Sequence, residues 1–225
     1  MIRLENIQRR YRSDEVETTA LNDVNLEVAA GEFVAIMGPS GCGKSTLLNT
    51  LGAVDRPTAG RYWFDGRDLA ALDEKELARF RGQTLGFVFQ SFNLIDDLTI
   101  EENVALGLAY RGEARDRRAR IAAAMDKVGI AHRARHFPFQ LSGGQQQRAA
   151  IARAIVGEPK LILADEPTGN LDTENGQQVM SILSGLNQEG ATVVMVTHSP
   201  SHADFARRRI DMLDGRIVAS AARAI

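Results

Sequence analysis

The sequence predicts an α/β fold whose central strands are parallel. The first sign is the segment 33–52, where a continuous apolar run is followed by a glycine-rich loop and then by a helical pattern. Apolar runs of the same kind return at 161–165 and 192–197, with a helical pattern at 173–190 between them. Uninterrupted apolar runs are typical of strands buried on both faces, and alternation of strands with helices predicts a parallel sheet.

The N-terminal elements have a different pattern. Segments 2–7 and 24–28 alternate apolar and polar residues, as half-exposed strands do. A strand with its turn is expected at 61–66, a helix at 73–81 and a further strand at 84–90.

Residues from about 95 to 157 are predicted to be helical. Thr99 and Glu102 have the spacing of a capping box at the start of a helix over 99–110, and further helices are expected at 116–129 and 143–157. We therefore expect one domain over residues 1–225, with its core at about 1–90 and 159–225 and an inserted helical lobe at about 91–158. Strands are expected at 208–213 and 216–220, and the tail 219–225 is expected to be frayed helix or disorder.

Composition excludes several classes of protein. The formal net charge of −2 lacks the basic excess that nucleic-acid-binding domains usually carry, so no nucleic-acid partner is expected. No apolar run approaches the roughly 20 residues of a membrane-spanning helix, and the first residues do not resemble a signal peptide. The single cysteine excludes an intramolecular disulfide. A cytosolic location is the resulting expectation.

The segment GPSGCGKST matches the phosphate-binding loop pattern G-x-x-x-x-G-K-[ST]. Its glycines let backbone N–H groups converge on an anion, and the following helix adds its positive end. Lys44 would neutralise the β- and γ-phosphates of ATP, and the Ser45 hydroxyl would bind Mg²⁺. The alternative is a glycine-rich turn before an ordinary helix, but the preceding strand and the following helix are the context that the motif requires. The loop residues predicted to bind nucleotide are Gly38, Pro39, Ser40, Gly41, Cys42, Gly43, Lys44, Ser45 and Thr46.

The segment LILADE supplies two carboxylates at the end of an apolar strand. Asp165 can hold Mg²⁺ directly or through water, because ligands bind at the carboxyl ends of strands in open α/β sheets. Glu166 points elsewhere and can orient or deprotonate an attacking water. A buried strand that ends in an acidic turn is the common alternative, so this motif is informative mainly beside the loop at 38–46.

The segment LSGGQQQR places Ser142, Gly143 and Gly144 at the start of a helix. This is a second helix end suited to an anion. One nucleotide rarely needs two such ends, so we expect a homodimer in which each chain contacts the γ-phosphate bound by its partner. The alternative is a capped helix with a tight entry turn.

These three segments together resemble the ATPase subunit of an ABC transporter, and the resemblance covers nearly the whole chain. It implies a RecA-like P-loop NTPase core, an N-terminal antiparallel β lobe and an inserted helical lobe. It also implies roles for four further residues. Gln90 resembles the glutamine that contacts Mg²⁺ and water. Asp172 resembles the aspartate that crosses the dimer interface. His198 resembles the histidine that contacts the γ-phosphate. Tyr11 resembles the aromatic that stacks on adenine. Taken singly, each has a structural alternative as a surface, hydrogen-bonded or packing residue.

The resemblance implies an ATP hydrolase with Glu166, His198, Lys44 and Gln90 as catalytic residues and Ser45, Gln90 and Asp165 around Mg²⁺. Segments 91–104, 138–154 and 162–172 resemble the branch that serves macrolide export, lipoprotein release and antimicrobial-peptide efflux. The implied partner is an integral-membrane permease, and the implied location is the cytoplasmic face of the inner or plasma membrane. ABC-type ATPases of cell division or assembly, and those of DNA repair or translation, are the alternatives.

Two narrower expectations concern surfaces. The permease is expected to dock around residues 91–110, where Phe92, Leu94 and Leu98 are apolar, although these side chains can also fill the core of the helical lobe. Cys42 is expected to react with a small maleimide unless MgATP covers it, because a nearby cation and a helix N-terminus activate thiols. The alternative is that Cys42 is too enclosed to react.

Overall fold

The apolar runs form the centre of a six-stranded sheet in the computed structural model, which describes residues 1–12, 17–110 and 116–222. The strand order is β10-β9-β3-β8-β7-β6, and all neighbours from β9 to β6 pair in parallel. The strands are β3 (Phe33–Met37), β6 (Leu85–Phe89), β7 (Leu161–Asp165), β8 (Thr192–Val196), β9 (Arg208–Leu213) and β10 (Arg216–Ala222). The predicted parallel centre is therefore confirmed.

A second sheet is antiparallel, with strand order β2-β1-β4-β5. Its strands are β1 (Ile2–Arg12), β2 (Glu17–Val28), β4 (Ala59–Phe64) and β5 (Arg67–Asp68). It forms the predicted N-terminal β lobe, but β1 and β2 extend beyond the predicted segments 2–7 and 24–28. Bulges near Ile7 and Arg9 shift the register, and each shift interrupts the alternation that marks a half-exposed strand in sequence.

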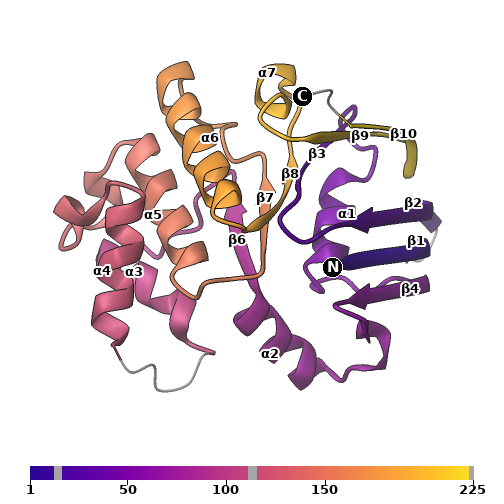
Figure 1. Ribbon diagram of the computed structural model, residues 1–225, viewed down its shortest axis with the longest axis horizontal. Helices are drawn as coiled ribbons and strands as arrows, with labels where there is room; N and C mark the ends of the chain where they lie inside the picture. The colour runs from indigo at the N-terminus through magenta and orange to yellow at the C-terminus, as the bar shows by residue number, and fades with distance from the viewer. Residues whose placement is uncertain (13–16, 111–115, 223–225) are drawn as a thin grey trace.

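Helices connect and cover the sheets. Figure 1 shows α3, α4 and α5 at one end of the molecule and β1, β2 and β4 at the other, with the parallel strands between. Capping boxes start α2 at Asp73, α3 at Thr99 and α5 at Ser142. The helices are α1 (Lys44–Leu51), α2 (Glu74–Thr84), α3 (Ile100–Ala105), α4 (Arg117–Lys127), α5 (Gly143–Ile155), α6 (Thr173–Gln188) and α7 (Pro200–Ala203), with short 3-10 turns at Leu69–Ala71, Leu106–Leu108, Ala131–Arg133 and Pro138–Gln140.

Strand β3 separates two apolar cores. Phe33 and Ala35 belong to a cluster with the apolar residues of α3 to α6, whereas Val34 and Ile36 face a cluster with α1 and the antiparallel sheet. Successive side chains of a strand point to opposite faces, so this division follows from a strand that is apolar at every position. The helical segment, which runs from α3 to α5 over residues 100–155, therefore shares one of these cores with the sheet.

The helix predicted over 99–110 is shorter than expected. It changes to a 3-10 turn at Leu106–Leu108. A Cβ at Gly107 would lie 2.2 Å from the carbonyl oxygen of Arg153, so the turn brings the backbone directly against α5. Close backbone contact requires glycine at this position, and helix propensity alone could not predict it.

Arg153 fixes the segment that follows β6. Its guanidinium is largely buried, which lowers its pKa, and it donates hydrogen bonds to the carbonyl oxygens of Phe92 (2.8 Å) and Asn93. Both carbonyl-bearing residues have left-handed backbone conformations, with φ of +60° and +50°. The side chain from α5 therefore holds a turn that is strained for residues with a Cβ.

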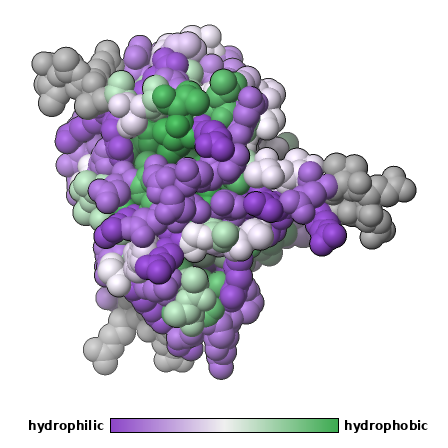
Figure 2. All heavy atoms as spheres, turned by 90° about the vertical axis from the view of Figure 1, so that its right-hand side faces the viewer, coloured by the Kyte–Doolittle hydropathy of each residue, from purple (hydrophilic) through white to green (hydrophobic). Residues whose placement is uncertain are grey.

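The tail differs from the prediction of frayed helix or disorder, because β10 continues to Ala222 by antiparallel pairing with β9. Residues 223–225 lie outside the described residues. The side of the molecule formed by the antiparallel strands is mostly hydrophilic, with apolar residues gathered in its upper part (Figure 2). Among the helices that the structure describes, none has the length and apolar character needed to cross a bilayer.

Candidate functional site

The carboxyl ends of four parallel strands meet at one edge of the larger sheet. Asp165 pairs with Phe89 on one side and with Val196 on the other, and Ile36 pairs with Val196. Ligands bind at this edge in open α/β sheets. The predicted residues that follow these strands, and so come together here, are the loop 38–46, Gln90, Glu166 and His198.

The loop after β3 follows a path that only glycine allows at two positions. Gly38 has φ of +154° and Gly43 has φ of +101°. A Cβ at Gly38 would lie 2.3 Å from the carbonyl oxygen of Met212, and a Cβ at Gly43 would lie 2.4 Å from that of Ala20. The glycines of the motif are therefore required by the conformation of the loop.

Lys44 begins α1 and is only 8% exposed. Its Nζ donates hydrogen bonds to the carbonyl oxygens of Gly38 (2.9 Å) and Pro39 (2.8 Å), so the ammonium lies inside the curl of the loop. No side chain caps the N-terminus of α1. Its first N–H groups and the ammonium can therefore serve an anion together.

The thiol of Cys42 is enclosed. Cys42 is 3% exposed, packs in the core between α1 and the antiparallel sheet, and has its Sγ 3.9 Å from Lys44 Nζ. The structure supports the alternative in which this cysteine fills space beneath the loop, and not the expectation of a reactive thiol.

We expect Cys42 to resist a small maleimide in the folded chain, both with and without MgATP, because the reagent cannot reach a buried sulfur. Intact-mass measurement should show at most one addition, and at a useful rate only when urea unfolds the chain. Labelling of the folded chain as fast as the unfolded control would contradict the enclosed position.

Ser45 and Asp165 place two oxygen atoms side by side. Ser45 Oγ lies 3.4 Å from Asp165 Oδ1. Burial raises the pKa of Asp165, the Ser45 hydroxyl opposes this shift, Glu166 adds to it and Lys44 opposes it. A carboxylate in this setting gains from a nearby cation, and carboxylate and hydroxyl oxygens suit Mg²⁺.

Glu166 and His198 are paired. Glu166 Oε2 lies 3.0 Å from His198 Nδ1, and the histidine side chain is 69% exposed. Glu166 has φ of +44°, a left-handed conformation that costs a non-glycine residue about 1 kcal/mol. Such strain concentrates at functional sites, and here the strained residue carries the side chain that contacts His198.

Gln90 lies against the loop that follows Glu166. Its Nε2 donates to Asn170 Oδ1 (3.1 Å), and Asn170 Nδ2 donates back to the Gln90 carbonyl oxygen (3.2 Å). A Cβ at Gly169 would lie 2.7 Å from Gln90 Nε2. The glutamine is therefore fixed beside the loop that carries Glu166 and Asp172.

The N-terminus of α5 is capped by its own residues. Ser142 Oγ accepts a hydrogen bond from Gln145 N (3.4 Å), and Gln145 Oε1 accepts one from Ser142 N (3.1 Å). The Ser142 hydroxyl hydrogen is not used by this cap. Packing requires glycine at position 144, because a Cβ there would lie 1.9 Å from Asn175 Oδ1.

Asp172 caps α6. Its carboxylate accepts hydrogen bonds from Asn175 N (2.8 Å) and Asn175 Nδ2 (2.8 Å), and these bonds lower the pKa of Asp172. Asn175 therefore contacts both Asp172 and Gly144, and it holds the starts of α5 and α6 together. The structure brings these two predicted residues within reach of one amide side chain.

Tyr11 lies on β1, and its contacts run to Arg9 and Asp55. Its hydroxyl donates to Asp55 Oδ2, and the Arg9 guanidinium lies 4.5 Å from the ring centroid. Arg9 also forms a 2.9 Å ion pair with Asp55. These contacts fix the ring, which is 40% exposed.

Four residues near this edge were not predicted from the sequence, namely Asn170, Asn175, Thr168 and His202. Asn170 lies within the GNLD string and Asn175 follows three residues after its end, so an amide close to the predicted site residue Asp172 was a usable signal. Thr168 and His202 are joined by a hydrogen bond across 34 residues of sequence, for which no local pattern exists.

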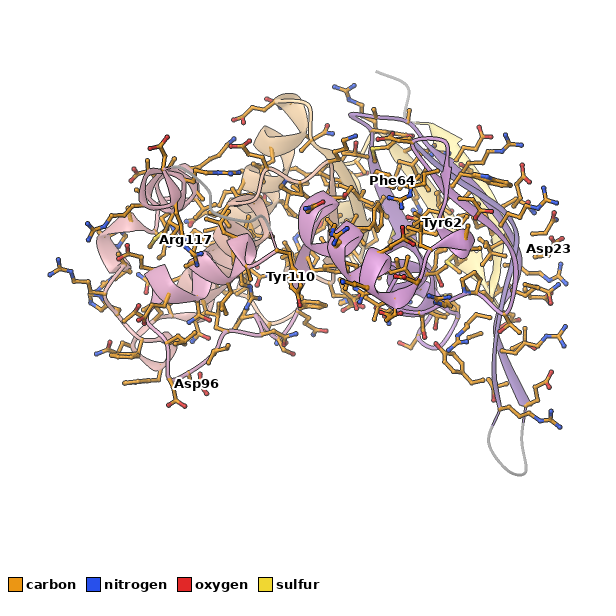
Figure 3. The ribbon with its side chains drawn as sticks, turned by 90° about the horizontal axis from the view of Figure 1, so that it is seen from below. Asp23, Tyr62, Phe64, Asp96, Tyr110 and Arg117 are labelled. Atoms are coloured by element: carbon orange, nitrogen blue, oxygen red, sulfur yellow. The ribbon has the colours of Figure 1, made fainter. Side chains whose placement is uncertain are left out.

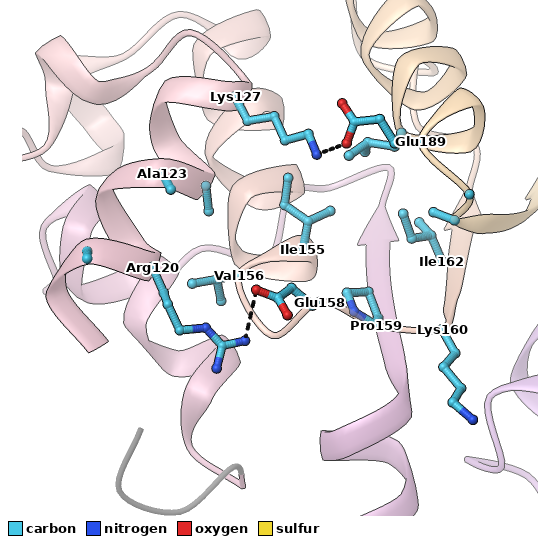
Figure 4. Close-up of a pocket in the computed structure, with 15 residues that line it drawn as sticks. Arg120, Ala123, Lys127, Ile155, Val156, Glu158, Pro159, Lys160, Ile162 and Glu189 are labelled. Atoms are coloured by element: carbon cyan, nitrogen blue, oxygen red, sulfur yellow. Dashed lines mark hydrogen bonds and ion pairs between the residues drawn. The ribbon is translucent and has the colours of Figure 1, made fainter. Parts of the chain in front are cut away.

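A separate groove lies away from this edge of the sheet. It has a volume of about 620 Å³ and is lined by one face of α4 and by the C-terminal ends of α5 and α6 (Figure 4). Ion pairs join Lys127 to Glu189 and Arg120 to Glu158 at its walls. No residue of the loop 38–46 lines it. The first of these pairs ties α4 to the residue after α6.

Comparison with known proteins agrees with this geometry. A profile of the family described as ABC transporter matches residues 21–169. The ABC transporter ATP-binding protein YknY of Bacillus subtilis is 48% identical over 219 residues, which cover 97% of this chain and 95% of that protein. The macrolide export ATP-binding/permease protein MacB 1/2 of Paracoccus denitrificans is 50% identical over 97% of this chain but only 33% of its own length.

A solved structure is also similar over the whole chain. The dimeric post-hydrolysis state of the ATP-binding cassette MJ0796, bound to ADP and Pi, has a TM-score of 0.93 at 44% identity and covers 100% of both chains. The cbiO1 protein of the cbiONQ complex of Clostridium perfringens has a TM-score of 0.87 at 29% identity, over 98% of this chain and 88% of that one.

Proposed function

Since the chain belongs to the ABC transporter family, we propose that it powers a separate membrane permease by closing as a homodimer around two ATP molecules. It is an ATP-binding and ATP-hydrolysing subunit with the ABC ATPase fold. The observation that carries the proposal is the edge of the parallel sheet, where the phosphate loop, Asp165, Glu166 and His198 lie together.

The magnesium site is assigned to Ser45, Asp165 and Gln90. The 3.4 Å between Ser45 Oγ and Asp165 Oδ1 is somewhat longer than the separation of about 2.9 Å between neighbouring oxygen ligands of an octahedral Mg²⁺, so a small movement would bring both oxygens onto one ion. Gln90 Nε2 donates to Asn170, so we assign the amide oxygen of Gln90 to the ion. Bound Mg²⁺ would neutralise charge on the transferred phosphate.

The hydrolytic water is assigned to Glu166 and His198. A carboxylate can accept a proton from water or orient it, and the 3.0 Å contact between the two side chains supports a shared role at the γ-phosphate. Lys44 would hold the β- and γ-phosphates inside the loop.

A second copy would complete each site. The Ser142 hydroxyl, with Gly143 and Gly144 at the same helix end, would donate to the γ-phosphate held by the partner subunit. Asp172 would cross the interface, and Tyr11 would stack on adenine. The dimeric state of the similar MJ0796 cassette supports this arrangement.

We also place the boundaries of the inserted helical lobe near residues 91 and 158.

The cargo is proposed from the relatives. MacB proteins join an ATP-binding part to a permease in one chain, whereas YknY is matched over nearly its full length. We propose export or extraction of a hydrophobic compound, peptide or lipoprotein, with this chain held at the cytoplasmic face of the membrane by its permease. Identifying the membrane protein that co-purifies with the chain tests this. Co-purification with cell-division proteins alone would favour a non-transport role.

The permease is proposed to dock at a groove between α2 and the helical segment. This groove has a volume of about 440 Å³ and is lined by Phe87, Phe89, Leu106 and Tyr110 among others. Tyr110 is 63% exposed and lies between the helical segment and α2 (Figure 3). The sequence singled out other residues for this surface, namely Phe92, Leu94 and Leu98, but these are only half-exposed.

We expect Tyr110→Glu to weaken association with the permease at least about tenfold while leaving ATP hydrolysis by the isolated chain unchanged, because a charge would face an apolar partner surface. Co-purification yield and ATPase rate measure the two effects. Val218→Glu, at an exposed apolar position on β10, is the matched control. Crosslinks to the permease that fall only on the antiparallel sheet would exclude this groove.

A further inference from the structure

Two histidines, four residues apart, contact the loop that follows Asp165. His198 Nδ1 lies 3.0 Å from Glu166 Oε2, and His202 Nδ1 lies 2.8 Å from Thr168 Oγ1. The first contact is exposed, whereas Thr168 is only 9% exposed. The turn after β8 and the turn after β7 are therefore joined by two side-chain contacts, of which the inner one is partly buried.

The local sequence fixes His202 in this position. Ser199 caps α7 and its Oγ accepts a hydrogen bond from His202 N (3.4 Å), while Pro200 occupies the first position of the helix. The other edge of the ring faces the start of α6, where a Cβ at Gly176 would lie 3.7 Å from His202 Cε1 and Nε2. The ring is thus held between Thr168 and α6.

The inner contact joins neutral groups. Burial, and secondarily the nearby His198, hold the pKa of His202 below its usual value of about 6.5, so the ring is neutral at pH 7. A partly buried hydrogen bond between two neutral groups adds modest stability and has a defined geometry. It can fix the spacing of two turns without adding charge next to the phosphates.

We propose that His202 is a positioning residue for ATP hydrolysis, which keeps Glu166 and His198 in register by tying the α7 turn to Thr168. The inference rests on the proposed roles of Glu166 and His198. Glu166 has a strained left-handed backbone, so its side chain direction depends on how firmly the following residues are held. Thr168, two residues later, is held by His202.

The first test replaces His202 with leucine, which keeps the volume and removes the hydrogen bond. We expect kcat for ATP hydrolysis to fall about tenfold with KM for ATP unchanged, because misplaced catalytic groups slow the chemical step without weakening phosphate binding. His202→Asn places an amide where Nδ1 stands and should restore kcat to within about threefold of the unmodified chain. Thr168→Val should reproduce the leucine effect from the other side.

The controls separate positioning from folding. His132→Leu changes an exposed histidine of the helical segment and should leave kcat unchanged. Thermal unfolding of every variant is measured alongside. If the asparagine variant is as slow as the leucine variant, or if kcat follows the unfolding temperature across the set, the inference is overturned.

The second test asks whether His202 acts through Glu166. In a Glu166→Gln background, the further loss caused by His202→Leu should shrink to about threefold or less, because Glu166, one of the two groups that it positions, is already gone. A full tenfold additional loss would overturn the inference. An unmodified chain without ATPase activity would instead refute the proposed function, so the two failures are distinguishable.

Discussion

Replacing Glu166 with glutamine should leave MgATP binding intact and slow hydrolysis at least about a hundredfold, because an amide keeps the shape of the side chain but cannot accept the proton of the attacking water. Glutamine also preserves a partner for His198 at the 3.0 Å contact, so the turn should keep its conformation. The ATP-bound dimer should then accumulate. Turnover is measured by phosphate release, and mass in solution by light scattering with and without ATP.

Glu174→Gln is the matched control for this variant. Glu174 is an exposed acid in the first turn of α6, so its loss changes the net charge equally without touching the proposed water site. A Glu166→Gln variant with turnover near that of the unmodified chain would remove the base role. A variant that binds ATP but stays monomeric would count against the dimer.

Lys44→Ala should weaken ATP binding at least about a hundredfold. Hydrogen bonds from a charged group contribute about 1.5–3 kcal/mol each, and the ammonium would make more than one with the phosphates. The variant also removes the donor that the Gly38 and Pro39 carbonyl oxygens share. Part of the loss should therefore appear as a more variable loop conformation.

Titration with a fluorescent ATP analogue measures the affinity, and hydrogen exchange of the loop amides measures its order. Lys160→Ala serves as the control, because Lys160 is an exposed lysine whose partner is Asp65, 2.7 Å away. Affinity equal to that of the unmodified chain in Lys44→Ala would remove the assignment of this residue to the phosphates.

Elements with strong local sequence signals were predictable. Strands β3, β7 and β8 were predicted within one residue, because an apolar run bounded by turn residues has few alternatives. The start of α2 was predicted within one residue, at Asp73. The ends of β1 and the break at Gly107 were missed, because they depend on bulges and on contact with α5.

The candidate site likewise combines residues with a local sequence signal and residues that only long-range packing brings together. The glycine loop was predictable, because its conformation demands glycine at fixed positions. The contacts of Tyr11 with Asp55 and of Thr168 with His202 join residues that are 44 and 34 positions apart. No periodicity or motif encodes such pairs, since only the packed chain brings them together. The burial of Cys42 likewise depends on packing between α1 and the antiparallel sheet and has no local sequence signal.

The hydrogen bonds from Arg153 to the Phe92 and Asn93 carbonyl oxygens connect α5 to the turn that follows β6. The helix has 13 residues and is therefore about 20 Å long. Ser142 caps the N-terminal end of α5. Arg153, near the C-terminal end, donates hydrogen bonds to the turn next to the 440 Å³ groove. A hydrogen-bonded helix of this length behaves as a stiff rod, so a tilt applied at one end moves the other. Arg153 thus connects the groove, through α5, to the helix end that is proposed to contact nucleotide on the partner subunit.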